Sequence, residues 1–191
     1  MNKEESLRFY LDLAQREGIK LFENLPKQDW ALVRWWVDLV NTGEIDAIVQ
    51  KTSQTLYTFL GVFQPPARLL YSANEKGEIE FVHWAKAVSG RPEENTASNG
   101  LWGAKHLRGS KKHMIFNYIT YKIIFCFCDV ILGETWQPEH LDRHRKIGYD
   151  VVGYMPNFLG REQYYFVRLT EKDFDASESI QKVAKLIERI K

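Results

Sequence analysis

Apolar residues recur at helical spacing in the first forty positions. The first group is Leu7, Tyr10, Leu11 and Ala14, and Gly18 after it is typical of a helix end. A second helix is predicted from Lys27 to Val40, with a third, short one from Glu44 to Gln50. The second has a wide apolar arc that includes Trp30, Trp35 and Trp36. This tryptophan cluster is interpreted as core, and a partner surface is the alternative.

The pattern changes to strand-like alternation in the middle of the chain. Strands are predicted at Thr55–Phe63, Arg68–Ser72, Glu78–Lys86 and Gly100–Leu107, with a polar loop at Ser89–Ser98. The segment Asn74–Gly77 is a hairpin turn between two of them. Along the second hairpin arm, Ile79, Phe81, His83 and Ala85 are predicted to share one face.

Helices and strands alternate in the second half. A helix is predicted to follow Arg108–Ser110 and to run to Phe125, with a polar stripe of His113, Asn117 and Thr120. Then come a strand at Asp129–Thr135, a helix at Pro138–Lys146 ended by Gly148, and strands at Tyr149–Tyr154 and Gln163–Leu169, joined by a turn between Pro156 and Gly160. A last helix begins at Asp175, with a capping box to Glu178.

These elements predict one α+β domain over residues 1–191. It comprises a helical block at 1–52, a sheet core at 55–170 and a C-terminal helix at 175–191. The chain is 45% hydrophobic, which excludes a disordered protein. The N-terminus is too charged for a signal peptide, and the apolar stretch Ile123–Leu132 is too short to span a bilayer, so we expect a cytoplasmic protein with no membrane partner.

Charge is balanced overall, at +1, but it is unevenly distributed. No acid occurs from Asn95 to Cys128, and the bases there are Lys105, Arg108, Lys111, Lys112 and Lys122. This window indicates an anion site, and chance combined with burial is the alternative. A nucleic-acid interface, suggested by bases and aromatics between Trp102 and Tyr121, is less favoured because no neighbouring segment extends the positive patch.

The order of elements from Arg68 to Thr170 resembles the GCN5-related N-acetyltransferase (GNAT) superfamily. The strongest match is HRKIGYDVVGYMPN, His144–Asn157, which is similar to the family's helix-to-strand junction, followed by its last strand at Tyr165–Thr170. Some phage-encoded members have a similar ending. The resemblance implies a mixed, twisted sheet that splays in the middle, flanked by helices. It also implies transfer of an acetyl group from acetyl-CoA, or another acyl-CoA, to an amine.

The family's phosphate loop has the form Arg/Gln-x-x-Gly-x-Gly/Ala. Its counterpart here is Arg108, Gly109, Ser110, Lys111, Lys112 and His113, in which lysine and histidine replace the two small residues. The resemblance implies that these residues hold the pyrophosphate. Ser110 is a plausible N-cap, which places two lysines in the first helical turn, where a bound phosphate would offset their repulsion by the helix dipole.

Other family positions complete the expected site. Gln137 stands where an asparagine contacts the cofactor. His144 stands where a tyrosine protonates the leaving thiolate, and the alternative is a solvated histidine. The general base is not assigned, with Glu80 and His83 as candidates. His140 and His144 have metal-ligand spacing but lack further ligands, so no metal is predicted.

A rival interpretation keeps the fold without the chemistry. The loop glycines and the usual tyrosine are missing, so the chain could be a degenerate structural or assembly protein, such as a phage particle component located in the virion. Its N-terminal block and C-terminal helix would then contact an assembly partner or another copy in a homo-oligomer. The family usually opens with a strand, whereas this chain opens with helices, so the sheet either lacks that strand or replaces it with Thr55–Phe63. Cys126 and Cys128, in an apolar run, are interpreted as core.

Overall fold

The structure is a computed structural model that describes residues 2–22, 30–41, 68–87, 95–158 and 160–189. Its strands are β1 Ile19–Phe22, β2 Arg68–Ala73, β3 Ile79–Ala87, β4 Thr96–Gly103, β5 Val130–Thr135, β6 Asp150–Phe158 and β7 Arg161–Thr170. Its helices are α1 Lys3–Arg16, α2 Trp30–Asn41, α4 Lys111–Phe125, α5 Pro138–Ile147, α6 Glu171–Ala176 and α7 Glu178–Glu188, with a 3-10 turn η1 at Lys105–Leu107.

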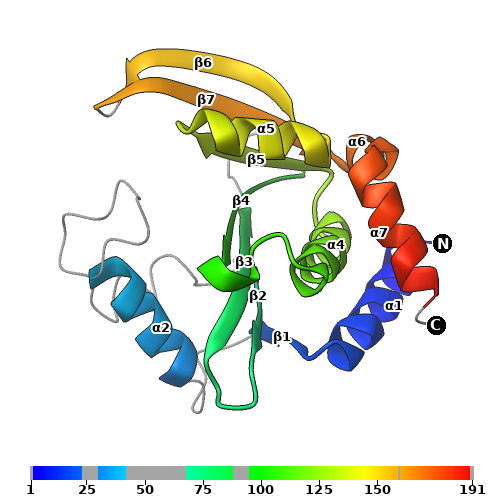
Figure 1. Cartoon of the computed structure of the whole chain (residues 1–191). Helices are drawn as coiled ribbons and strands as arrows, with labels where there is room; N and C mark the ends of the chain where they lie inside the picture. Colours follow the sequence, from blue (N-terminus) through cyan, green and yellow to red (C-terminus); the bar gives the residue numbers. More distant parts are fainter. Residues whose placement is uncertain (1, 23–29, 42–67, 88–94, 159, 190–191) are drawn as a thin grey trace.

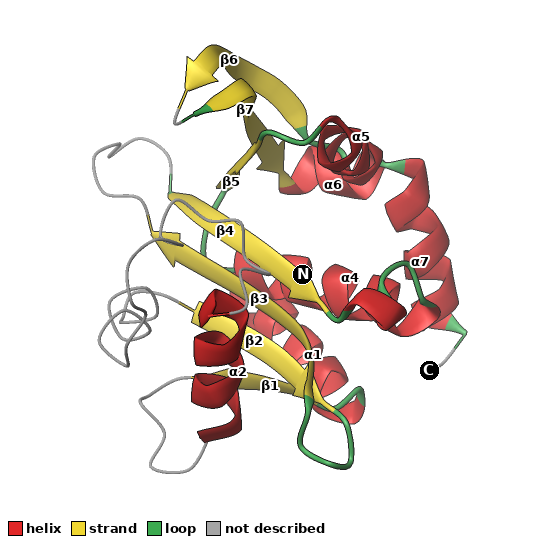
Figure 2. Cartoon of the chain, turned by 60° about the vertical axis from the view of Figure 1, so that its left-hand side comes forward, coloured by secondary structure: helices red, strands yellow, loops and turns green. Residues whose placement is uncertain are grey.

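The strands form one mixed sheet in the order β1-β2-β3-β4-β5-β7-β6. All neighbours are antiparallel except β4 and β5, which are parallel. Helix α4 packs beside the sheet together with α1 and α7, while α2 lies on the opposite face of β2 and β3 (Figures 1 and 2). The predicted α+β architecture, with helices on both faces, is therefore confirmed.

Alternation along β3 separates two apolar cores. Phe81 and Ala85 belong to the larger cluster around α4, whereas Val82 packs with Leu32 and Trp36 of α2. The interpretation of the tryptophans as core is confirmed for Trp36, which is 4% exposed. Ile79 is an exception to the predicted face: it packs with the α2 cluster, because the register with β2 shifts between Ser72 and Ala73.

The strand predicted at Gly100–Leu107 begins and ends closer to the N-terminus, at Thr96 and Gly103. Strand β4 begins at Thr96, and its pairing with β3 runs from Ala97–Ala87 to Gly103–Phe81. The polar sequence of this segment suggested a loop, but Asn99 finds hydrogen-bond partners inside the protein. The turn between β6 and β7 is also tighter than predicted, and Pro156 sits within β6, an edge strand that tolerates it.

The predicted C-terminal capping box is wrong. Asp175 lies inside α6, and its carboxylate binds Lys122 instead of capping a helix. Ser177 occupies the N-cap of α7 without a side-chain capping hydrogen bond, because its hydroxyl donates to the Lys146 carbonyl at 2.7 Å. The apolar face of α7 is confirmed, since Ile180, Val183 and Ile187 are buried.

The N-terminal region contains a strand that the sequence pattern did not reveal. After α1, whose end before Gly18 is as predicted, β1 pairs antiparallel with β2 at the edge of the sheet. The predicted helix at Glu44–Gln50 and strand at Thr55–Phe63 lie outside the described residues. Among the described helices, none combines the length and apolar character needed to cross a bilayer.

Candidate active site

The sheet divides between β4 and β5. These strands pair only at Thr96–Ser98 with Val130–Leu132. Beyond that point β4 continues along β3 as far as Gly103, and β5 continues along β7 as far as Thr135. The edge of β4 past Ser98 is therefore unpaired toward β5, and its backbone polar groups face the seam (Figure 2). The predicted splay in the middle of the sheet is present.

A buried polar network fills the α4 side of this seam. Asn99, the first β4 residue past the paired segment, donates from Nδ2 to His83 Nε2 at 3.0 Å. The Tyr149 hydroxyl lies 3.4 Å from Asn99 Oδ1 and 3.1 Å from the Tyr121 hydroxyl. On the β5 side Gly133 lies next to Asn99: a Cβ there would lie 3.6 Å from Asn99 Oδ1 and would crowd Val167 Cγ2 at 3.2 Å. Side chains from β3, from α4 and from the residue that precedes β6 thus fill the seam where backbone pairing between β4 and β5 has ended.

His83 is part of this network and has no free nitrogen for use as a base. Its Nδ1 lies 2.8 Å from Thr120 Oγ1, which itself donates to the Asn117 carbonyl, so His83 carries its proton on Nδ1 and accepts at Nε2. Burial lowers the pKa of His83 to about 3. Glu80, the other candidate base, lies beside the start of α4, where its carboxylate binds Lys112 Nζ at 2.5 Å.

The predicted phosphate loop leads into α4 with the expected cap. Ser110 Oγ accepts from the backbone N–H of His113 at 3.1 Å, which places Lys111 and Lys112 in the first turn. Gly109 adopts φ +78°, a conformation that suits glycine. Arg108 is turned back, with Nε donating to the Gly103 carbonyl at 2.7 Å.

His113 occupies part of the loop. Its Nδ1 accepts the Gly109 N–H at 3.0 Å, and its ring stacks on Phe81 with centroids 5.1 Å apart. Within the described part of the chain, the backbone N–H groups of Lys111 and Lys112 keep no protein acceptor. The loop therefore offers an anion two backbone donors of the first turn, while the donor at Gly109 is taken.

Positive charge converges on this loop from a second element. Burial, Arg108 and Arg143 of α5 together lower the pKa of His113. The pKa of His140 is lowered by burial and by the same two arginines, partly offset by Glu139. The N-terminus of α4 and the exposed side of α5 thus form one cationic region, as a bound pyrophosphate would require.

Gln137 and His144 lie at opposite ends of α5. Gln137 is the N-cap and uses its backbone N–H toward Thr135 Oγ1, at 3.4 Å. His144 is partly buried, and its Nδ1 donates to the His140 carbonyl at 2.6 Å. Burial lowers the pKa of His144, partly offset by that hydrogen bond, so at neutral pH its Nε2 is an acceptor. It must bind a proton before it can donate one.

Two residues at the seam were not singled out from the sequence. Tyr149 contacts the His144 ring edge-on at 4.9 Å and carries its hydroxyl into the seam. Tyr149 lies within the helix-to-strand junction His144–Asn157, and this position is the sequence feature that could have identified it. Glu134 is an exposed carboxylate on β5, and alternation along that strand places it on the α2 face, opposite Gly133. Only knowledge of the strand pairing could reveal this.

The comparisons with known proteins identify the architecture. No protein-family model matches the chain, and no curated protein matches it. Solved structures do match it. One is a phosphinothricin acetyltransferase from Sinorhizobium meliloti in complex with AcCoA, with a TM-score of 0.57 at 12% identity, covering 80% of this chain and 88% of that one. A GCN5-related N-acetyltransferase from Kribbella flavida gives a TM-score of 0.57 at 14% identity, covering 81% and 99%. The fold is that of the GNAT superfamily.

A third GNAT-fold structure, yncA from Salmonella typhimurium with its cofactor acetyl-CoA, gives a TM-score of 0.56 at 15% identity, covering 84% of this chain and 98% of that one. The resemblance read from the sequence is thus confirmed for the fold. Within the described residues, no group of three potential metal ligands occurs. Burial raises the pKa of Cys126, which is half-buried, and raises that of Cys128 to about 12. The interpretation as core is confirmed for Cys128, which is 3% exposed.

Proposed function

We propose that this protein is an acyl-CoA-dependent N-acyltransferase that moves an acetyl group from acetyl-CoA to an amine. The observation that carries the proposal is the seam. Pairing between β4 and β5 ends at Ser98 and Leu132, and the open edge of β4 leads directly to the cationic start of α4. An extended thioester cofactor fits such an arrangement, with its phosphates at the helix and its acyl end in the sheet.

In this proposal the loop from Arg108 to His113 binds the pyrophosphate. The backbone N–H groups of Lys111 and Lys112 would contact phosphate oxygens, and Lys111 and Arg143 would add charge. Gln137, at the start of α5, would contact the cofactor chain. The unpaired N–H groups of β4 past Ser98 would polarise the thioester carbonyl as negative charge develops on its oxygen.

The departing thiolate needs a proton donor. We assign this role to His144, which would first take up a proton at Nε2 and then deliver it. The lowered pKa of His144 makes its protonated imidazole a stronger acid than that of an ordinary histidine, but a less abundant one at neutral pH. The hydroxyl of Tyr149 is the competing donor because it already lies in the seam. His144→Phe and Tyr149→Phe, compared at equal acetyl-CoA binding, decide between them by which variant loses kcat.

A second candidate, a non-catalytic assembly protein with this fold, is favoured by one observation. His113 takes the Gly109 N–H that would otherwise be open to a phosphate. A partner chain or another copy would then use the N-terminal block and α7. The enzyme candidate suits the reducing cytoplasm expected from two free thiols, whereas the assembly candidate would be located in the virion.

The deciding experiment follows release of CoA thiol when the protein is mixed with acetyl-CoA and a panel of primary amines. The enzyme interpretation predicts amine-dependent thiol release that the Lys111→Ala variant slows. If the protein does not bind acetyl-CoA and releases no thiol with any amine, the assembly interpretation remains.

A further inference from the structure

An aromatic box lies on the α2 face of the sheet, next to the open end of the seam. Its members are Trp136, Phe158, Tyr164 and Phe166. Tyr164 is at the centre: it stacks on Trp136 with centroids 6.0 Å apart, meets Phe158 at 5.1 Å and lies 5.5 Å from Phe166. The guanidinium of Arg161 sits 5.1 Å from the centre of the Trp136 ring, so one face of this box already attracts a cation.

The hydroxyl of Tyr164 is unusual among these groups. Tyr164 is 1% exposed, and within the described residues its hydroxyl makes no hydrogen bond of ordinary geometry. Burial raises the pKa of Tyr164, and the Glu134 carboxylate close to its hydroxyl raises it further. A buried hydroxyl whose hydrogen bond is poorly formed is costly, so a ligand donor from which both Tyr164 and Glu134 can accept would be stabilised there.

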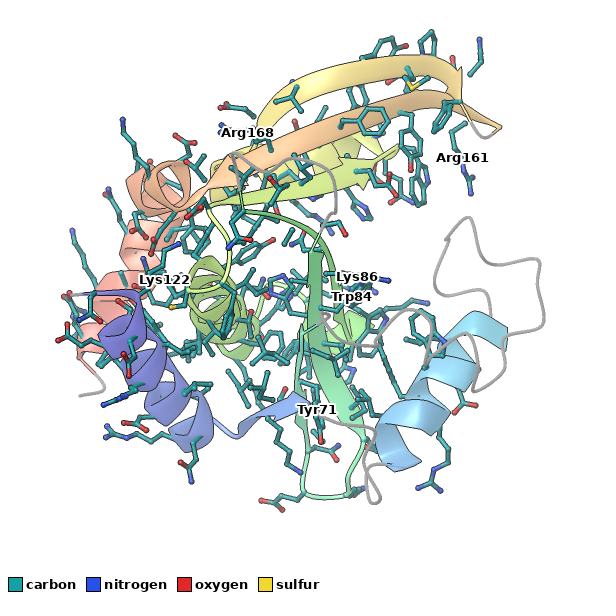
Figure 3. All side chains as sticks on the ribbon, turned by 180° about the vertical axis from the view of Figure 1, so that it is seen from behind. Tyr71, Trp84, Lys86, Lys122, Arg161 and Arg168 are labelled. Atoms are coloured by element: carbon teal, nitrogen blue, oxygen red, sulfur yellow. The ribbon has the colours of Figure 1, made fainter. Side chains whose placement is uncertain are left out.

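Glu134 also faces the seam. The β4–β5 register pairs Thr96 with Val130 and Ser98 with Leu132, so continuing it would set Gly100 opposite Glu134. The strands have parted at that point, and both residues lie on the α2 face by alternation. The indole of Trp84 covers Gly100 on the β3 side, because a Cβ on Gly100 would lie 2.0 Å from Trp84 Cζ2. Figure 3 shows Trp84 and Arg161 projecting to the side of the sheet on which α2 lies.

We infer that Glu134 and Tyr164 bind the ammonium group of the acceptor, and that the acceptor is a cationic amine carried on an apolar or aromatic chain. The carboxylate accepts charge-assisted hydrogen bonds from the ammonium, and the Tyr164 oxygen accepts a further one. The aromatic ring of Phe166 attracts the cation and packs against the chain that carries it. This inference rests on the proposed function, because it places the amine across the seam from the thioester.

The test uses 2-phenylethylamine as acceptor, with 3-phenylpropionate as an anion of similar size. At saturating acetyl-CoA, Glu134→Gln should raise the KM for the amine on the order of tenfold, with kcat changed less than about threefold. Tyr164→Phe should raise KM severalfold, and Glu134→Asp should recover part of the loss. The control, Glu75→Gln, removes an exposed carboxylate in the β2–β3 turn and should change nothing. An unchanged KM in Glu134→Gln overturns the inference.

A binding measurement separates failure of this site from failure of the proposed function. Tryptophan fluorescence is titrated with the amine, with and without CoA, in the wild-type protein and in Trp136→Phe to identify the reporter. A saturable change that Glu134→Gln abolishes, and that 3-phenylpropionate does not produce, supports the site even if no acetyl transfer occurs. If acetyl-CoA binds but the amine produces no saturable change, the site is wrong and the cofactor proposal stands.

Discussion

The Nδ1 atom of His113 accepts the backbone N–H of Gly109 at 3.0 Å. In a phosphate-binding loop that N–H is a natural donor to the ligand, so this contact competes with cofactor binding. The stacking of the same ring on Phe81 explains why the histidine adopts this position. Phosphate binding by this loop therefore depends on the donors that stay available, which are the backbone N–H groups of Lys111 and Lys112, and on the surrounding cations.

Replacing His113 with alanine should free the Gly109 donor. We expect tighter acetyl-CoA binding, by about three- to tenfold, from the added hydrogen bond to a charged group. We also expect a loss of stability of about 1 kcal/mol from the missing contact with Phe81. Calorimetric titration and urea unfolding measure the two effects, with exposed His106→Ala as the control. Weaker binding would mean that His113 itself contacts the phosphates.

The two lysines of the first helical turn should differ in their effect on cofactor affinity. Lys111 is exposed, whereas the ammonium of Lys112 is paired with Glu80. Lys111→Ala should weaken acetyl-CoA binding by about three- to tenfold and flatten its salt dependence, while Lys112→Ala should weaken it less. Lys185→Ala, an exposed lysine on α7 away from the loop, is the matched control. Equal affinity in all three variants would remove the loop from the cofactor site.

Lys122 joins α4 to α6. Its ammonium is 2.6 Å from Glu171 and 2.9 Å from Asp175, and its side chain is 9% exposed. Lys122→Met should lower the free energy of unfolding by about 1–3 kcal/mol, allowing for solvent screening of the half-exposed carboxylates. Exposed Lys185→Met should cost almost nothing. Urea unfolding with equal midpoints for the two variants would contradict a stabilising role.

The same lysine predicts how stability depends on pH. Burial alone would lower the pKa of Lys122, but Glu171 and Asp175 outweigh it and raise the pKa above its ordinary 10.5. Its contribution is therefore fully present below pH 10.5 and is lost as the pH rises through the folded-state value. Wild-type and Lys122→Met unfolding midpoints should converge in that alkaline range, and a constant gap would disprove the assignment.

The two cysteines should be unreactive in the folded protein. Burial raises the pKa of Cys128 to about 12 and also raises that of Cys126, so little thiolate exists at neutral pH. With a disulfide reagent at pH 8, we expect both thiols to react at least tenfold more slowly in the native than in the urea-unfolded protein. A fast native reaction would point to a functional thiol instead.

Local signals predicted much of this fold because they arise from side chains close in sequence. Ser110 capping α4, Gly148 ending α5 and the turn at Asn74–Gly77 all lie where the pattern placed them. Errors occurred where distant contacts dominate. Asn99 is in a strand because His83 and Tyr121 satisfy it, and Asp175 is in a helix because Lys122 binds it.

The candidate site likewise has features that the sequence revealed and features that only the structure revealed. The loop was visible from Arg108 to His113, but the Gly109–His113 bond that changes its meaning was not. Glu134 carried no sequence signal, since its place opposite Gly100 follows only from the β4–β5 register. Pairing between strands far apart in the chain has no local pattern to reveal it.

Acetyl-CoA binding is the central claim, and thermal unfolding in the presence of the cofactor tests it most directly. Binding at the seam predicts stabilisation that rises with concentration and reaches about 2.7 kcal/mol at a hundredfold excess over the Kd. The rise should be smaller in the Lys111→Ala variant. A melting temperature that does not move at millimolar acetyl-CoA would contradict the account.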